Sequence, residues 1–214
     1  PRTSPPSIVD VARAAGVSTA TVSRCLNEPE RVREATRERV AAAIRALDYA
    51  PHFGARALML NRTNTMGAVI PTMANAIFAR GLQALQERLA AAGVTLFVAT
   101  SGYDPEREAE QIKALVARGV DGLVLIGEDR ACDVYRFLEK RGVPHVLAWT
   151  WRADAQRVYA GFDNAAAAAA MTQLVIAEGH RDIGMIAGIT RGNDRARARV
   201  AGVRAALAGV GSML

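Results

Sequence analysis

The stretch most suited to chemistry runs from Asp10 to Asn27, with the sequence DVARAAGVSTATVSRCLN. At helical spacing its second half places five side chains on an outer face: Thr19, Ala20, Thr21, Ser23 and Arg24. They are short, apart from one basic residue, and they lie near the expected start of a helix. Small side chains and hydrogen-bond donors suit a helix that enters a DNA groove.

Two short helices joined by a tight turn would position that face. A capping-box pattern ending at Asp10 predicts where the first helix begins. Gly16 stands where a helix end needs a positive φ, and Ser18 can cap the second helix. Val22 and Leu26 would give the second helix its inward stripe. These features favour a helix-turn-helix, and an ordinary helical hairpin with a polar outer face is the alternative.

Motifs of common enzymes do not occur in the sequence, which lacks a P-loop, G-x-G-x-x-G, H-E-x-x-H and G-x-S-x-G. The three histidines lie far apart, at positions 52, 145 and 180. Glu106, Glu108 and Glu110 are expected to form a solvated helix face. We therefore expect no enzyme, no cofactor and no metal site.

Composition and charge point to a partner at the amino-terminal end. The 214 residues carry a formal charge of +6, and residues 1–63 hold ten Arg against six Asp and Glu. A basic end suits a polyanion. No run is apolar enough to span a membrane, no export segment is recognised, and Cys25 and Cys132 give no disulfide framework. A cytoplasmic location is expected.

From Met66 onward, apolar runs alternate with helical stretches, which predicts βαβ units and a parallel sheet. The expected strands lie within 66–71, 95–100, 121–127 and 144–149, and the expected helices within 76–92, 105–118 and 131–141. A helix follows to Ala177, residues 179–188 supply a turn and a strand, and a last helix starts near Asp194. Ligands of such sheets bind beyond the carboxyl ends of the strands, here at 71–75, 100–103, 127–129 and 149–151.

The pattern D-V-A-x-x-A-G-V-S-x-x-T-V-S-R, continued by L-N, resembles the lac repressor (LacI/GalR) family of bacterial regulators. Y-x-P at 49–51, A-R-A-L at 55–58 and M-G-A-V-I-P at 66–71 follow at the family's positions. The resemblance implies an all-α helix-turn-helix head and an α/β effector domain like a periplasmic sugar-binding protein. We expect the head at 1–50, a hinge at 51–63, a first lobe at 64–161 and the start of a second lobe at 162–214. The second lobe looks incomplete, so we expect a truncated chain.

The resemblance also assigns roles on DNA. Thr19, Ala20 and Arg24 would contact base edges, with Arg24 the best candidate for a bidentate contact to guanine. Residues expected to hold phosphates and set the register are Ser18, Thr21, Ser23, Asn27, Thr36 and Tyr49.

Residues 52–62 could form a linker or a short helix, because helices of this length are marginal in water. In the family this segment is a hinge helix that orders on operator DNA. Leu58 matches a leucine that inserts between base pairs in the minor groove, and Ala55 and Arg56 match residues lying in that groove. The alternative is that Leu58 only contacts the next domain.

Four residues match the family's effector site: Ile77, Phe78, Trp149 and Arg199. Phe78 and Trp149 would offer flat apolar faces to a ring, and Arg199 would hydrogen-bond a hydroxyl or an acid group. The alternatives are core packing for Phe78 and surface charge for Arg199.

Together these features imply a sequence-specific transcription regulator, most simply a repressor. It would bind a pseudo-palindromic site in double-stranded operator DNA as a homodimer and respond to a small-molecule effector, a carbohydrate or related metabolite. One alternative is a truncated regulator that binds DNA without an effector response. Another is a sugar-binding receptor, which would need a secretion signal and no DNA-reading head.

Overall fold

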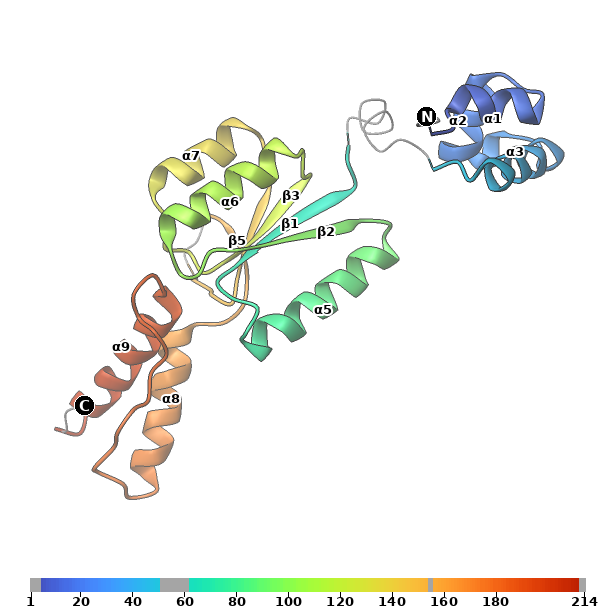
Figure 1. Cartoon of the computed structure of the whole chain (residues 1–214). Helices are drawn as coiled ribbons and strands as arrows, with labels where there is room; N and C mark the ends of the chain where they lie inside the picture. The colour runs from blue at the N-terminus through green and yellow to red at the C-terminus, as the bar shows by residue number, and fades with distance from the viewer. Residues whose placement is uncertain (1–4, 51–61, 154–155, 212–214) are drawn as a thin grey trace. The chain divides into compact units, whose positions relative to one another are not determined.

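The computed structural model describes residues 5–50, 62–153 and 156–211. The chain divides into two compact units, Pro1–Asn61 and Arg62–Leu214. Figure 1 shows the helical first unit in blue and the sheet-containing second unit from green to red. This is the predicted combination of an all-α head and an α/β domain.

The first unit is a three-helix head. It contains α1 (Ile8–Ala15), α2 (Thr19–Asn27), a 3₁₀ turn η1 (Pro29–Arg31) and α3 (Glu34–Leu47). Its small core is formed by Val11, Ala12, Ala15, Val22, Val40 and Ala43, all of which are buried. Each helix contributes one apolar stripe, so the opposite faces are left to solvent.

The predicted turn between α1 and α2 is confirmed in its details. The carboxylate of Asp10 accepts a hydrogen bond from the Ser7 backbone N–H at 2.9 Å, and the Ser7 hydroxyl accepts from the Asp10 N–H, which completes the capping box. Gly16 ends α1 with φ of 63°. Ser18 then caps α2 by accepting from the Thr21 N–H at 3.2 Å. Local sequence alone therefore fixes the position at which α2 begins.

The second unit is built on a five-stranded parallel sheet with the order β2-β1-β3-β4-β5. The strands are β1 (Thr65–Ile70), β2 (Thr95–Thr100), β3 (Gly122–Ile126), β4 (His145–Ala148) and β5 (Val158–Ala160). In β1, Met66 lies opposite Leu96 of β2 on one side and Gly122 of β3 on the other. The parallel sheet and its first four strands agree with the sequence prediction.

Helices cover both faces of the sheet. Figure 1 shows α6 (Pro105–Ala117) and α7 (Cys132–Lys140) on one face and α5 (Ala76–Ala91) on the other. The larger core lies under α6 and α7, and a smaller core around Ile70, Phe78 and Ile126 lies under α5. Alternation along β1 sends Val69 to the first core and Ile70 to the second.

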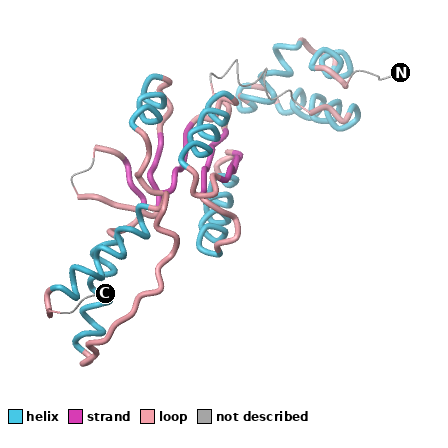
Figure 2. The backbone as a smooth tube through the Cα atoms, turned by 60° about the vertical axis from the view of Figure 1, so that its left-hand side comes forward, coloured by secondary structure: helices cyan, strands magenta, loops and turns pink. Residues whose placement is uncertain are grey.

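Two further helices, α8 (Asn164–Ala177) and α9 (Asp194–Ala208), pack as a pair that extends away from the sheet (Figures 1 and 2). They approach closely at Gly202, where an added Cβ would collide with the backbone carbonyl of Ala165. None of the described helices is long and apolar enough to cross a membrane.

The prediction of a strand within 179–188 is wrong. These residues run as an irregular chain between α8 and α9, and Ile186 is fully exposed. A strand is stable only where a neighbour exchanges backbone hydrogen bonds with it, and none of the described strands lies beside this segment. The structure also adds β5, which was not predicted because three residues are too short a run to indicate a strand.

Candidate functional site

The outer face of α2 forms a concave surface on the head, which we call the reading face. It is lined by Ile8, Thr19, Ala20, Ser23, Arg24, Asn27, Glu28 and Arg31. The three residues predicted to contact bases, Thr19, Ala20 and Arg24, are all exposed on it. In the part of the chain that the structure describes, the Arg24 guanidinium has no hydrogen bond or ion pair, so its donors are available.

Some predicted phosphate contacts are already engaged within the head. Ser18 is exposed, and its hydroxyl lies 3.0 Å from that of Thr21. Asn27 donates from its side-chain amide to the Ser23 carbonyl at 3.0 Å and to the Ser23 hydroxyl at 3.3 Å. A phosphate accepts hydrogen bonds, so Asn27 must turn away from Ser23 before it can donate to DNA.

The amide oxygen of Asn27 is buried and has no partner among the described residues. The last two predicted phosphate contacts belong to α3 and its end. Thr36 stands in the first turn of α3, and Tyr49 follows α3, half-buried against the head's core. The three hinge residues, Ala55, Arg56 and Leu58, lie outside the described residues.

In the second unit, two of the predicted effector residues pack against each other at the end of the sheet. Phe78 is only 5 % exposed, and its ring centroid lies 5.6 Å from that of Trp149, edge to face. Phe78 thus takes the core-packing alternative in this structure. Trp149 is half-buried over α5 at Gly81, where any side chain would collide with the indole. Ile77, the residue before Phe78 in α5, is 60 % exposed.

Arg199 is joined to the same end of the sheet through Asn164. The Arg199 guanidinium donates to the Asn164 side-chain oxygen at 2.6 Å, and the Asn164 amide donates to the Trp149 carbonyl at 3.0 Å. Arg199 is half-buried rather than a free surface charge. This chain of two hydrogen bonds links α9, the start of α8 and the end of β4.

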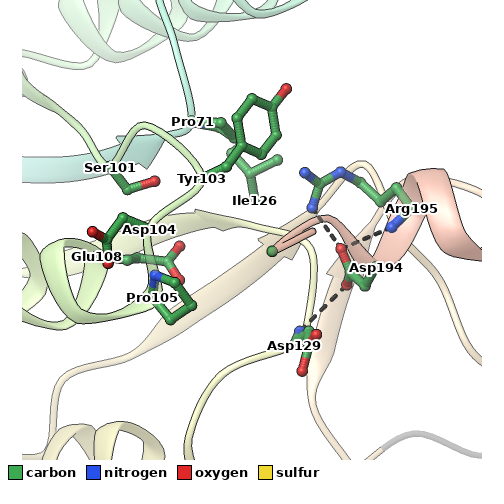
Figure 3. A pocket seen from close by; sticks show the side chains of 11 residues that line it. Pro71, Ser101, Tyr103, Asp104, Pro105, Glu108, Ile126, Asp129, Asp194 and Arg195 are labelled. Carbon is green, nitrogen blue, oxygen red and sulfur yellow. Dashed lines mark hydrogen bonds and ion pairs between the residues drawn. The ribbon is translucent and has the colours of Figure 1, made fainter. Parts of the chain in front are cut away.

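A polar cavity that the site prediction missed lies beyond the carboxyl ends of β1, β2 and β3 (Figure 3). Its lining comprises Pro71, Ser101, Tyr103, Asp104, Pro105, Glu108, Ile126, Asp129, Gly192, Asp194 and Arg195. At about 20 Å³ it has room for roughly one water molecule as the structure stands. Three of the four segments predicted as ligand-binding strand ends contribute to it, but none of the four predicted effector residues does.

Helix α9 closes this cavity with its first residues. The Asp194 carboxylate accepts from the backbone N–H groups of Glu128 at 2.6 Å and Asp129 at 3.3 Å, and from the Arg195 guanidinium at 2.8 Å (Figure 3). Burial lowers the pKa of Arg195, and the Asp194 charge opposes that shift. These contacts hold α9 against the loop that follows β3.

The expectation that Glu108 belongs to a solvated helix face is wrong. Glu108 pairs at 2.8 Å with Arg130, whose side chain is 2 % exposed. Residues two apart on a helix point in different directions, so Glu106, Glu108 and Glu110 cannot share one face. Burial raises the pKa of the Glu108 carboxyl, and the Arg130 charge partly opposes that effect.

Arg130 shapes the carboxyl end of β3. Its guanidinium donates to the carbonyls of Ile126 at 2.9 Å and Gly127 at 2.6 Å, which lie where the strand ends. The guanidinium thus supplies hydrogen bonds to carbonyls that, at the end of the strand, have no neighbouring strand among the described residues to donate to them. The lining of the cavity offers carboxylate acceptors and one buried cation, and the cation and one carboxylate, Arg195 and Asp194, are paired with each other. Among the described residues, no three His, Cys, Asp or Glu side chains gather as metal ligands would.

Comparison with known proteins matches both units. Residues 7–52 match the family model described as bacterial regulatory proteins, lacI family. Residues 63–213 match the model of periplasmic binding proteins and sugar binding domain of LacI family. The chain is 34% identical over 178 residues to the HTH-type transcriptional regulator GntR of Escherichia coli strain K12. The aligned residues cover 83% of this chain and 54% of that protein.

Two solved structures are similar over 98% of this chain and 63% of their own. One is a lacI-family transcriptional regulator from Silicibacter pomeroyi, with 29% identity and a TM-score of 0.86. The other is the lac repressor dimer bound to operator and the anti-inducer ONPF, with 26% identity and a TM-score of 0.81. The chain therefore spans little more than half the length of these relatives.

Proposed function

The chain belongs to the lacI family of bacterial regulatory proteins, and from this premise we propose that it acts as a sequence-specific transcriptional repressor. The observation that carries the proposal is the reading face. There α2 buries Val22 in the head's core and turns Thr19, Ala20 and Arg24 to solvent. A short helix with small outward residues and one exposed guanidinium fits a major groove.

On DNA, Thr19, Ala20 and Arg24 read base edges. The residues Ser18, Thr21, Ser23, Asn27, Thr36 and Tyr49 hold phosphates and fix the register. A homodimer places two heads on a pseudo-palindromic operator, and Leu58 inserts into the minor groove between them with Ala55 and Arg56 beside it. The similarity to a lac repressor dimer solved on its operator supports this arrangement.

The second unit binds a small-molecule effector, a carbohydrate or related metabolite, beyond the carboxyl ends of the strands. The match to a sugar-binding domain supports this assignment. Ile77, Trp149 and Arg199 contact the effector, and Phe78 supports the Trp149 ring from behind. Effector binding shifts α8 and α9 against the sheet, which alters the spacing of the hinge segments.

Binding-site selection from a random duplex library tests the proposal, using the whole chain and its Arg24→Ala variant. We expect the wild-type chain to enrich one sequence and the variant to lose preference at one position of each half-site. An unchanged preference in the variant would remove Arg24 from base reading. Sugar binding without any duplex preference would favour a receptor, and DNA binding that no ligand alters would favour a regulator without effector response.

A further inference from the structure

The reading face carries a second arginine, beyond the predicted base contacts, which is held by a neighbouring carboxylate. Arg31 donates from its guanidinium to the Glu28 carboxylate at 2.8 Å, and both side chains line the reading face with Thr19 and Arg24. Building on the proposed function, we propose that Arg31 reads a guanine at the edge of each half-site. Glu28 is the positioning residue that orients it.

The backbone between the two residues favours a fixed orientation. Arg31 ends the 3₁₀ turn Pro29–Arg31, and its N–H donates to the Glu28 carbonyl at 3.0 Å. The pair is therefore tied twice, once through the main chain and once through the side chains. Pro29 removes further freedom from the connecting residues. A long side chain that is already ordered loses less entropy when it binds.

The remaining donors of Arg31 match a base edge. A guanidinium has five N–H donors, and the Glu28 contact uses one terminal nitrogen, which leaves Nε and the other terminal nitrogen available. Two such donors match O6 and N7 of guanine in the major groove. The Arg31 side chain is 71% exposed, so this contact needs no rearrangement of the head.

The charge of the pair argues against a phosphate as the target. Phosphate contacts gain affinity mainly by releasing counterions from DNA, and that gain depends on net positive charge. Arg31 and Glu28 together are nearly neutral, so they would release few ions. Base reading depends instead on where the donors point, which the pairing improves.

Stability alone gives little reason for the pair, because exposed ion pairs contribute little to folding. The head also contains a matched pair that does not line the reading face. In α1, Arg13 contacts Asp10 at 3.1 Å with the same spacing of three residues, and its side chain is 76% exposed. Arg13→Ala is therefore the control for removing a paired, exposed arginine from this head.

The test combines binding-site selection with the salt dependence of affinity, measured by fluorescence anisotropy with the full 214-residue chain. For Arg31→Ala we expect loss of about 10- to 100-fold discrimination for guanine at one outer position of the half-site. The slope of log affinity against log salt should stay unchanged. Arg13→Ala should alter neither quantity.

Glu28→Gln should make the reading face more positive, whereas Arg31→Ala makes it less so. It frees the Arg31 cation, so affinity for random duplex should rise and the salt slope should steepen by about 0.9. Discrimination at the same outer position should weaken, because Arg31 is no longer held. Removing a negative charge raises affinity for random DNA whatever Glu28 does, so the loss of discrimination at the outer position is the result that a purely structural role would not give.

Two results would overturn the proposal. If Arg31→Ala flattens the salt slope by about 0.9 and keeps the base preference, Arg31 contacts a phosphate. If Arg31→Ala changes neither quantity, Arg31 does not contact DNA. In both cases the wild-type chain still selects a sequence, so the proposed function stands. A wild-type chain that selects no sequence would instead refute the proposed function, and this inference with it.

Discussion

The ion pair between Glu108 and Arg130 supports the strongest prediction about stability. In Arg130→Met, the new side chain keeps much of the volume but removes the charge. Glu108 then remains under the sheet end with 14% of its side chain exposed and without its ion-pair partner, and Arg195 is the remaining cation that acts on it. The carbonyls of Ile126 and Gly127 also lose the donors that they share in the wild-type chain.

The size of the effect follows from that arrangement. Removing one partner of a buried ion pair typically costs about 3–5 kcal/mol, because the other charge stays buried without compensation. Each carbonyl left without a donor adds about 1 kcal/mol or more where water cannot replace it. We therefore expect a loss of roughly 4 kcal/mol at neutral pH where water replaces both lost donors, and roughly 6 kcal/mol where it replaces neither.

The loss should depend on pH in a defined direction. Burial already raises the pKa of Glu108 above its ordinary value of 4.5, and removing Arg130 raises it further. A carboxyl whose pKa is higher in the folded state stabilises the fold below its unfolded pKa and loses that contribution as pH rises through the folded pKa. The difference between variant and wild type should therefore be largest at pH 8 and shrink toward pH 4.5.

Urea unfolding followed by tryptophan fluorescence measures this difference. The chain has two tryptophans, Trp149 and Trp151, and both lie in the second unit, so the signal does not report on the head. The double variant Arg130→Met with Glu108→Gln is the control, because it removes both charges of the pair, and it should recover much of the loss. A deficit of the same size at pH 5 and pH 8 would refute the argument from Glu108 ionisation.

Three further predictions concern other contacts. Gly202→Ala should destabilise the second unit by up to about 2 kcal/mol in urea unfolding, because overpacking against Ala165 costs about 1–3 kcal/mol and the added helix propensity returns roughly 1 kcal/mol. A raised midpoint would mean that the two helices separate freely to admit the methyl group. Asp194→Ala should speed hydrogen exchange at the backbone amides of residues 128 and 129, measured by NMR, and equal rates would show that Asp194 does not protect them. Leu58→Ala should weaken operator binding far more than binding to random duplex in anisotropy titrations, and equal losses would argue against insertion into the minor groove.

The head could be predicted almost completely because its signals are local. The Ser7 cap, Gly16 and the Ser18 cap each act within a few residues, so the bounds of α1 and the start of α2 follow from sequence alone. The first four strands were predicted for a related reason. A strand covered on both faces is an apolar run, and such a run needs no knowledge of its neighbours.

The features that the sequence did not predict correctly all depend on residues that lie far away in the sequence. β5 is recognisable only through its register with β4, where Val158 lies opposite Val146. Residues 179–188 have the composition of a strand, but no described strand accepts them. Glu108 looks like a surface residue until Arg130, 22 positions later, is brought beneath it. Pairing across such separations is set by the packing of whole elements, which periodicity does not encode.

The lining of the cavity at the strand ends was not predicted for the same reason. Ser101 follows β2 and Arg195 is the second residue of α9, and only the docking of α9 onto the loop after β3 brings them together. Family resemblance pointed instead to Ile77, Phe78, Trp149 and Arg199, of which Phe78 lies in the core of this structure. The segments at the strand ends were predictable from topology, whereas the individual side chains were not.

The side chain of Asn164 gives the second unit a chemical weak point. Its side-chain oxygen accepts a hydrogen bond from the Arg199 guanidinium, and its side-chain nitrogen donates one to the Trp149 carbonyl. One neutral amide group is therefore acceptor and donor at once. An aspartate at this position would keep an oxygen toward Arg199 but would set a second oxygen against the Trp149 carbonyl. Exchanging one nitrogen for oxygen would thus release the end of β4 from α8 while α9 stayed attached.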